Sequence, residues 1–407
     1  MNQLPYTTFR ELQKLAHGKQ LVLFGAGNIC EKSLRKLHCR PVCIVDNSPT
    51  IWGSAQDGIR IVKPDEIRGA KEKFYIVICT TSFREVGEQL NEMGYEGATD
   101  FVVSPVLNDL RVVDDLQFVK TELLLTSGAP SASLGISEGG IYRLDVNGAD
   151  YKLEQILAGS AHGMIKKADN IYVVEDRLGV VELDATFKAK RNLELPKGSR
   201  GHGIAWSEET QCFYVACSYL DQVLEISEAF EIKRSFDVSI KAGRTDGPHH
   251  HLNDCFCTGG SLYVSMFSLT GNWKKEVFDG GVLEFDIASG QIVGTPVTGL
   301  WMPHNIAMIN GGLVVLDSLK GAYLGNNMQE IGRFPGFTRG LAYDADFTYI
   351  GQSRNRNFSR QIGVSNNISI DSGVVIFDER TKVSRTISLP QTVTEIHALL
   401  RLNDSQT

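Results

Sequence analysis

The residues with the clearest chemistry in this chain are histidines that recur through its C-terminal three quarters. A similar setting returns at intervals of 35 to 58 residues, at His162, His202, His251, His304, Arg339 and His397. Ten or twelve residues after the first five positions, a strand-like run places an apolar or aromatic residue: Tyr172, Tyr214, Tyr263, Val314 and Tyr349. Equivalent residues of a repeat take equivalent places in a fold, so these side chains are predicted to converge.

A group of neutral imidazoles is a good site for a transition metal. Three or four of them can hold iron, zinc or manganese and leave positions open for a substrate. The sequence therefore predicts a divalent metal, Fe, Zn or Mn. The candidate ligands are His162, His202, His251, His304 and His397.

Two other interpretations of the histidines stay open. In one, they form a metal-free polar pocket that binds an anionic ligand with Arg339 and moves protons. In the other, they are structural, like the Gly-His pairs of WD-repeat blades. No matching Trp-Asp pair stands at the strand ends, which disfavours this second interpretation.

Charged residues beside the histidines are the candidate catalytic groups. Asp254 follows His251 closely, and Glu395 precedes His397 by two positions. Either carboxylate can orient an imidazole or act as a base, and Arg339 can fix an anionic group. Arg339, Asp254 and Glu395 are therefore the predicted catalytic residues.

Three long connections are expected on the face of the molecule where the histidines lie. They span residues 127–139, 268–280 and 353–372, and long loops on a rigid scaffold often serve a ligand. They carry residues that can hold phosphate or carboxylate: Trp273, Lys274, Lys275, Arg354, Arg356 and Arg360. Asp176 and Asp317, at the ends of second strands, are predicted to cap turns or to orient an imidazole.

The elements that must position these residues are short strands. From residue 121 onwards, apolar runs alternate with glycine-containing and polar turns, at a period typical of four-stranded propeller blades. The sixth histidine repeat, residues 396–402, has room for one strand only. Its missing partners stand at 123–126, 140–146 and 151–157. The sequence thus predicts an all-β six-bladed propeller whose C-terminal strand closes the first blade.

The C-terminal region also resembles a family of bacterial six-bladed propeller proteins. The resemblance is carried by residues 250–254, 302–305, 312–318, 335–342 and 351–354. It implies the propeller fold for the whole C-terminal domain and brings no established reaction with it.

The first hundred residues alternate apolar strands with helical patterns. Strands are expected at 20–24, 42–45, 74–79 and 101–103, which predicts a small α/β Rossmann-like domain. Gly25 and Gly27 suit a phosphate-binding turn before a helix, and Asp46 can accept hydrogen bonds from a ribose. The predicted nucleotide-binding residues are Gly25, Gly27, Asn28 and Asp46. Cys30 replaces the third glycine of the usual pattern, and a purely structural turn capped by Asp46 remains an alternative.

Residues 24–28, 45–48 and 58–67 resemble the small N-terminal domain of bacillosamine-type sugar N-acetyltransferases. That resemblance implies a nucleotide-sugar as ligand and a role in surface-polysaccharide biosynthesis. A nucleotide or NAD is also compatible with the glycine turn.

Composition bounds the remaining choices. The net charge of −7 disfavours nucleic-acid binding, no apolar run is long enough to cross a membrane, and the eight scattered cysteines indicate a cytoplasmic protein. Two domains joined by a linker are expected: a nucleotide or nucleotide-sugar module at 1–108, a linker at 109–120 and the propeller at 121–407. An oligomer is compatible with all of this.

The leading hypothesis is a metal-dependent enzyme of sugar or surface-polysaccharide biosynthesis, a lyase, epimerase or hydrolase acting on a small, anionic, sugar-like ligand. The alternatives are a non-catalytic ligand-binding or sensor propeller and an NAD-dependent oxidoreductase.

Overall fold

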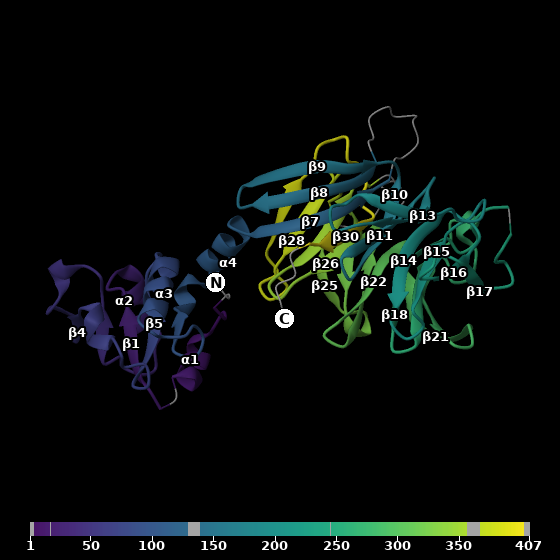
Figure 1. The fold of residues 1–407 in the computed structure, drawn as a ribbon. Helices are drawn as coiled ribbons and strands as arrows, with labels where there is room; N and C mark the ends of the chain where they lie inside the picture. Colours follow the sequence, from purple (N-terminus) through teal and green to yellow (C-terminus); the bar gives the residue numbers. More distant parts are fainter. Residues whose placement is uncertain (1–3, 17, 129–138, 245, 356–366, 403–407) are drawn as a thin grey trace. The chain divides into compact units, whose positions relative to one another are not determined.

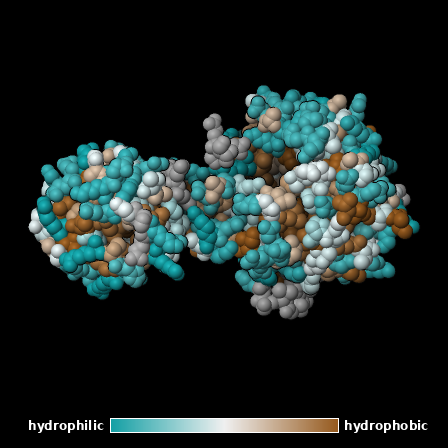
Figure 2. Space-filling model, turned by 90° about the horizontal axis from the view of Figure 1, so that it is seen from below, coloured by the Kyte–Doolittle hydropathy of each residue, from teal (hydrophilic) through white to brown (hydrophobic). Residues whose placement is uncertain are grey.

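The computed structural model describes residues 4–16, 18–128, 139–244, 246–355 and 367–402. The chain divides into two compact units, Met1–Asp115 and Leu116–Thr407. Figure 1 shows the helices and the larger strands of the first unit and the all-β second unit. Hydrophilic residues cover most of the face in Figure 2, with hydrophobic residues scattered among them. Among the described residues, no helix has the length and hydrophobicity needed to span a bilayer.

The first unit is built around a six-stranded sheet of order β3-β4-β2-β1-β5-β6. Its elements are α1 (Phe9–Leu15), β1 (Gln20–Phe24), α2 (Asn28–Leu34), β2 (Cys43–Val45), η1 (Pro49–Ile51), β3 (Ala55–Gln56), β4 (Ile59–Val62), η2 (Pro64–Ile67), β5 (Phe74–Ile78), α3 (Phe83–Glu92), β6 (Phe101–Val103), η3 (Pro105–Leu107) and α4 (Asn108–Gln117). Alternate residues of β1 and β5 enter two separate apolar clusters, so both faces of the sheet are buried.

The prediction of a Rossmann-like α/β domain is wrong. The sheet is mixed, because β3 runs antiparallel to β4. Within this unit α-helices cross over only from β1 to β2 and from β5 to β6, and short 3₁₀ turns and a hairpin occupy residues 49–67. That segment carries Pro49, Gly53, Gly58 and Pro64, which disfavour an α-helix. The strands were predictable from their hydrophobicity, but helices between all of them were not justified.

The glycine turn after β1 is held by Asp46. One carboxylate oxygen of Asp46 accepts from the backbone N–H of Ala26 at 2.8 Å, and the other accepts from that of Ser48 at 2.8 Å. Gly25 has φ of +105°, and an added Cβ would lie 3.0 Å from the carbonyl oxygen of Cys79. Gly27 is the N-cap of α2, which begins at Asn28. These contacts give the glycines and Asp46 a structural role that needs no ligand. Nucleotide binding at Gly25, Gly27, Asn28 and Asp46 stays a prediction.

The second unit is a six-bladed propeller, with four strands in each blade. Its strands are, blade by blade, β30 (Ala398–Arg401), β7 (Lys120–Ser127), β8 (Gly140–Asn147), β9 (Asp150–Ala158); β10 (Ala161–Lys167), β11 (Asn170–Glu175), β12 (Gly179–Leu183), β13 (Ala189–Leu193); β14 (Gly201–Ser207), β15 (Cys212–Cys217), β16 (Gln222–Ser227), β17 (Ile232–Asp237); β18 (Leu252–Thr258), β19 (Ser261–Met266), β20 (Gly280–Asp286), β21 (Gln291–Leu300); β22 (Pro303–Ile309), β23 (Gly312–Asp317), β24 (Ala322–Leu324), β25 (Glu330–Arg333); β26 (Phe337–Tyr343), β27 (Thr348–Ser353), β28 (Gly373–Phe377) and β29 (Ser384–Ser388). Each blade is antiparallel and begins, in this order, with its innermost strand.

The predicted closure of the ring is confirmed. β30 pairs with β7 along four residue pairs, from Ala398 opposite Thr126 to Arg401 opposite Leu123. The yellow strand β30 accordingly lies beside the blue strands β7 to β9 in Figure 1. The hydroxyl of Thr126 accepts from the N–H of Ala398 and donates to the carbonyl of His162, so one side chain joins the first and second blades.

Candidate functional site

The inner strands share an irregularity at the place where the histidines lie. In β10, β14, β18, β22 and β26 the pairing with the second strand shifts near the start of the inner strand. Such β-bulges bend a strand and redirect side chains, and they are frequent beside functional sites. The bulge lies at His162 in β10 and at His202 in β14, between register pairs that frame each residue.

Three of the predicted ligands form one cluster. The ring of His162 lies with its centroid 4.5 Å from that of His202 and 4.5 Å from that of His397. Each of the three residues offers a nitrogen such that the three atoms lie within 4.8 Å of one another. His162 and His202 are 3% and 7% exposed, and the side chain of His397 is 7% exposed. The cluster is therefore largely shielded from bulk water.

Acidic partners fix two of these imidazoles. Nε2 of His162 lies 2.9 Å from Oδ1 of Asp176, and Nε2 of His397 lies 3.2 Å from Oε2 of Glu395. A carboxylate only accepts, so each Nε2 carries a proton, and in a neutral ring Nδ1 then keeps a lone pair. Nδ1 of His162 and Nε2 of His202 are buried and find no hydrogen-bond partner in the described parts of the chain. Two buried nitrogens in one cluster thus lack a protein partner.

Burial favours the uncharged form of His202, His304 and His397. Burial, followed by the neighbouring imidazoles, holds the pKa of His202 well below its usual value. Burial, followed by Arg339 and His162, lowers the pKa of His397 to about 3. The pKa of His304 is also lowered well below the usual value, first by burial and then by Arg339. Neutral imidazoles are the form that binds a metal.

The other predicted ligands, His251 and His304, lie outside this cluster. His251 has a ring centroid 5.9 Å from that of His202 and stacks at 4.4 Å on Phe267. The ring of Phe267 also lies 5.3 Å from His304, which packs in turn against Phe337 at 5.5 Å. Aromatic side chains therefore interrupt the predicted ring of histidines on this side.

The register of β18 explains the position of His251. Asn253 lies between the pairs Leu252–Met266 and Cys255–Val264, which is the place that His202 has in β14. His251 comes before the strand and has φ of +58°. The sequence comparison treated His251 as the equivalent of His202. The strand register shows that the equivalent residue is Asn253, two residues later. Its Nδ1 is buried without a hydrogen-bond partner in the described chain, and its burial lowers the pKa to about 3.

Of the predicted catalytic residues, Arg339 and Glu395 lie behind the cluster and contact each other. Nη1 of Arg339 is 3.7 Å from Oε2 of Glu395 and 3.4 Å from Nε2 of His397. The guanidinium also lies 4.7 Å from the ring centre of Phe337. These contacts suit orientation of His397 more directly than capture of an anionic substrate.

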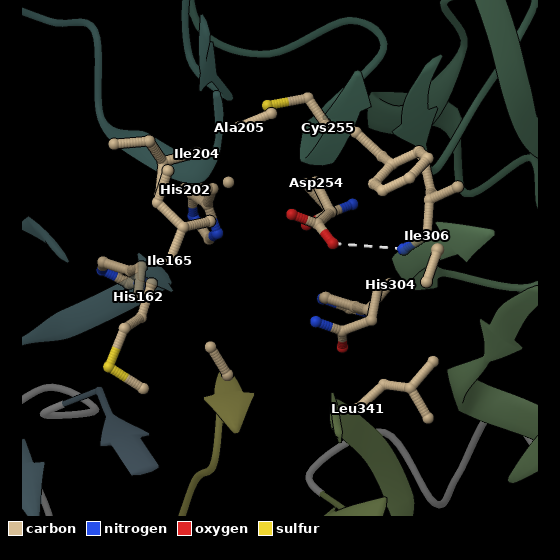
Figure 3. Close-up of a pocket in the computed structure, with 18 of the residues that line it drawn as sticks. His162, Ile165, His202, Ile204, Ala205, Asp254, Cys255, His304, Ile306 and Leu341 are labelled. Carbon is tan, nitrogen blue, oxygen red and sulfur yellow. Dashed lines mark hydrogen bonds between the residues drawn. The ribbon is translucent and has the colours of Figure 1, made fainter. Parts of the chain in front are cut away.

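Asp254 occupies a different place, inside the cavity. Figure 3 shows its carboxylate pointing into the cavity, with Oδ2 accepting from the backbone N–H of Ile306 at 3.2 Å. Asp254 stands at the register position of Gly163 and Gly203 in the preceding blades. Burial raises the pKa of its carboxyl to about 6. A carboxyl with that pKa can accept or donate a proton near neutral pH.

The cavity that holds these groups has a volume of about 370 Å³ and follows the inner strands. It is lined by His162, His202, His304, His397 and Asp254 and by apolar residues further along the same strands. The predicted ligand His251 is not part of this lining. The cavity size lies within the range of small-molecule sites.

The basic residues predicted on the loops do not form one site in the described structure. Lys274 pairs with Asp246 at 3.3 Å, and Nε of Arg354 donates to the carbonyl of Ile370 at 3.2 Å. Trp273 packs 5.4 Å from His251. Arg356 and Arg360 lie outside the described residues. Phe267, Phe337 and Ser318 were not identified from the sequence as parts of the site, although Phe267 directly follows β19 and Phe337 begins β26.

The donor set fits a divalent metal. Three imidazoles, two of them hydrogen-bonded to carboxylates, are a common arrangement around catalytic zinc. Ligands on a tetrahedral zinc lie about 3.4 Å apart, given Zn–N bonds of about 2.0–2.1 Å. The three nitrogens, within 4.8 Å of one another, need only a small inward movement to reach that spacing. The candidate set is therefore reduced from five histidines to His162, His202 and His397.

Fold and site together define a six-bladed propeller with a buried histidine cluster at its axis. Residues 152–407 match the family described as Domain of unknown function (DUF4915), and the chain belongs to this family. Residues 17–99 match the family described as C2185-like, N-terminal. The resemblance of the first unit to sugar N-acetyltransferases receives no support. No curated protein matches the chain.

Several solved structures are similar to part of this chain. A protein of unknown function from Bacteroides caccae is 14% identical with a TM-score of 0.50, over 70% of this chain and 100% of that one. A chain of the nidogen–laminin complex is 12% identical with a TM-score of 0.48, over 69% and 97%. Virginiamycin B lyase from Staphylococcus aureus is 14% identical with a TM-score of 0.38, over 53% and 71%. At these identities the likeness concerns the fold alone.

Proposed function

We propose that this protein is a metal-dependent enzyme that acts on a small molecule inside the propeller. The observation that carries the proposal is the convergence of His162, His202 and His397, whose donor atoms lie within 4.8 Å of one another. Two of the nitrogens in this cluster are buried without a partner among the described residues. Burying an unpaired polar atom destabilises the fold unless a ligand binds to it. An ion bound to the three imidazoles is the simplest such ligand.

The bound metal would supply a Lewis acid that polarises a carbonyl or lowers the pKa of a water molecule. His162, His202 and His397 would hold it, while Asp176 and Glu395 orient His162 and His397. Asp254 removes a proton from the substrate or from water, since its raised pKa suits a base near neutral pH. Elimination, epimerisation and hydrolysis all combine these two roles.

A link to sugar or polysaccharide biosynthesis is not part of this proposal. That link depended on the resemblance of the first unit to sugar N-acetyltransferases, which receives no support. The NAD-dependent alternative depends on the glycine turn after β1, where nucleotide binding stays a prediction, and it is not part of this proposal.

The test begins with the metal content of the purified protein, measured by elemental analysis. We expect about one iron, zinc or manganese per chain, lost in His202→Ala and retained in His304→Ala. The His304 variant is a matched control, because this histidine is equally buried and lines the same cavity without joining the cluster. A wild-type protein that binds none of the three ions when they are supplied would overturn the proposal.

The second part concerns Asp254. The metal-loaded protein is expected to act on members of a panel of aryl esters, lactones and α-substituted acids. Asp254→Asn should keep the metal and lose at least 100-fold in turnover on the same compound, in line with the contribution of a general base. Full activity in Asp254→Asn would remove this residue from the mechanism.

A further inference from the structure

The wall of the cavity beyond the histidine cluster is apolar in consecutive blades. Four residues share one register position on their inner strands: Ile165, Ala205, Phe256 and Ala307 are paired with Tyr172, Tyr214, Tyr263 and Val314 of the second strands. Leu341 and Leu399 line the cavity in the remaining two blades. We refer to these six residues of the inner strands as the apolar collar.

The cavity continues through the apolar collar to the ends of the inner strands. Its lining includes Lys166, near the end of β10, and Glu208, directly after β14. Both residues follow the collar in their blades, whereas the histidines precede it. A molecule that fills the cavity therefore meets imidazoles and Asp254 at one end, the collar in the middle and charged side chains at the far end.

On the other side of the histidines, the described loops are packed rather than open. Phe267, Met302, Leu319 and Phe337 form a buried apolar cluster, against which Trp273 packs. Phe267 stacks on His251 and contacts His304, so it lies directly against the site. The described cavity thus extends from the cluster towards the strand ends and not towards these aromatic residues.

A sugar does not suit this wall. Each hydroxyl that enters an apolar collar loses hydrogen bonds to water and gains none from Ile165, Phe256 or Leu341. An alkyl or aryl group, in contrast, gains free energy in proportion to the apolar area that it buries.

We propose that the substrate is a small molecule with a carbonyl-containing head and an alkyl or aryl tail, whose tail lies in the apolar collar. The position of the head rests on the proposed function, because the head is expected to bind the metal. The position of the tail rests on the apolar collar alone. The head reaches His162, His202, His397 and Asp254 first, and the tail points towards Lys166 and Glu208. This proposal takes the place of the sugar-like, anionic ligand that was expected from the sequence.

Straight-chain hydroxamic acids, from acetohydroxamic to octanohydroxamic acid, are suitable probes because the head binds metals and the tail varies by one methylene at a time. Their affinity for the full-length, metal-loaded protein is measured by calorimetry. We expect about a fourfold gain for each added methylene until the tail fills the collar.

Two variants locate the tail. Ala307→Leu should shorten the longest tail that still improves affinity, and Ala307→Trp should abolish the gain with tail length while affinity for acetohydroxamic acid changes less than threefold. Ala288→Trp is the control, because Ala288 is exposed in the same unit and distant from the cavity lining. Circular dichroism and thermal unfolding verify that each variant is folded, and Ala307→Leu keeps the test valid if the tryptophan variant does not fold.

The same series on chelator-treated protein separates the two proposals. A gain with tail length that persists without metal supports the apolar collar even if the metal-dependent function fails. If the hydroxamic acids bind tightly but their affinity does not rise with tail length, the tail does not lie in the apolar collar. The proposed metal site is then still supported. A gain that neither Ala307 variant alters also overturns the collar, because the tail then lies elsewhere.

Discussion

The first three blades and the last three blades differ in what lies between neighbouring histidines around the propeller axis. In the first three blades, His397, His162 and His202 follow one another with ring centroids 4.5 Å apart. In the last three blades, Phe267 lies between His251 and His304, and Phe337 lies between His304 and Arg339. The repeat places similar residues in both halves, yet only the first half leaves donor nitrogens facing one another. Histidine spacing along the chain alone therefore does not define a metal site.

The largest effect that would sharpen this comparison is on stability. Phe267→Ala removes a side chain that is 5% exposed and packs against two histidines and Trp273, so the free energy of unfolding should fall by about 3–5 kcal/mol. Metal content should remain at the wild-type level. Phe118→Ala, at a residue 61% exposed in the same unit, is expected to change stability by less than about 0.5 kcal/mol. Urea unfolding measures both variants, and a loss of metal in Phe267→Ala would show that the two halves depend on each other.

An intermediate effect concerns the residues behind the imidazoles. Asp176→Asn weakens the partner of His162, and we expect the affinity for zinc to fall about 10- to 100-fold. Ser318→Ala removes the hydroxyl that bonds Nδ1 of His304, and here the affinity should change less than about threefold. Competition with a chromophoric chelator gives both values. Equal losses in the two variants would mean that His304 is a ligand after all.

The last effect is on the pH dependence of stability. Burial raises the pKa of Asp254 from 3.8 to about 6, so the folded protein holds this proton more tightly than the unfolded chain does. Stability conferred by the protonated group is present below about pH 4 and is lost as the pH rises through 6. Asp254→Asn should therefore be more stable than wild type by up to about 3 kcal/mol at pH 8 and close to wild type at pH 4. Urea unfolding at both values checks this, and an unchanged difference across the range would contradict it.

Much of the propeller could be predicted from the sequence because strand periodicity is a local signal. Residues 396–402 had room for one strand, and that strand does pair with β7. The position of His251 could not be predicted in the same way. Only the pairing of β18 with β19 shows that Asn253 stands where β10 and β14 have His162 and His202. Register depends on partners across the sheet, and one residue of error turns a side chain to the other face.

The first unit shows the limit of the same reasoning. Buried strands such as residues 74–78 were clear from their hydrophobicity, and they form β5 and its neighbours. Helices between all of these strands were an assumption, and the proline and glycine residues of 46–73 favour turns instead. The aromatic residues between the histidines were missed for another reason. Phe267 and Phe337 read as ordinary apolar strand ends, and nothing local marks them as neighbours of an imidazole.

The pairing of β30 with β7 ties the proposed metal site to the completeness of the fold. His397 immediately precedes β30, whereas His162 and His202 lie more than 190 residues earlier in the chain. A chain whose β30 has detached still carries two of the donors but loses the third. Retained metal would then indicate that the propeller is fully assembled. Detachment of β30 from β7 would release the ion before the other blades unfold.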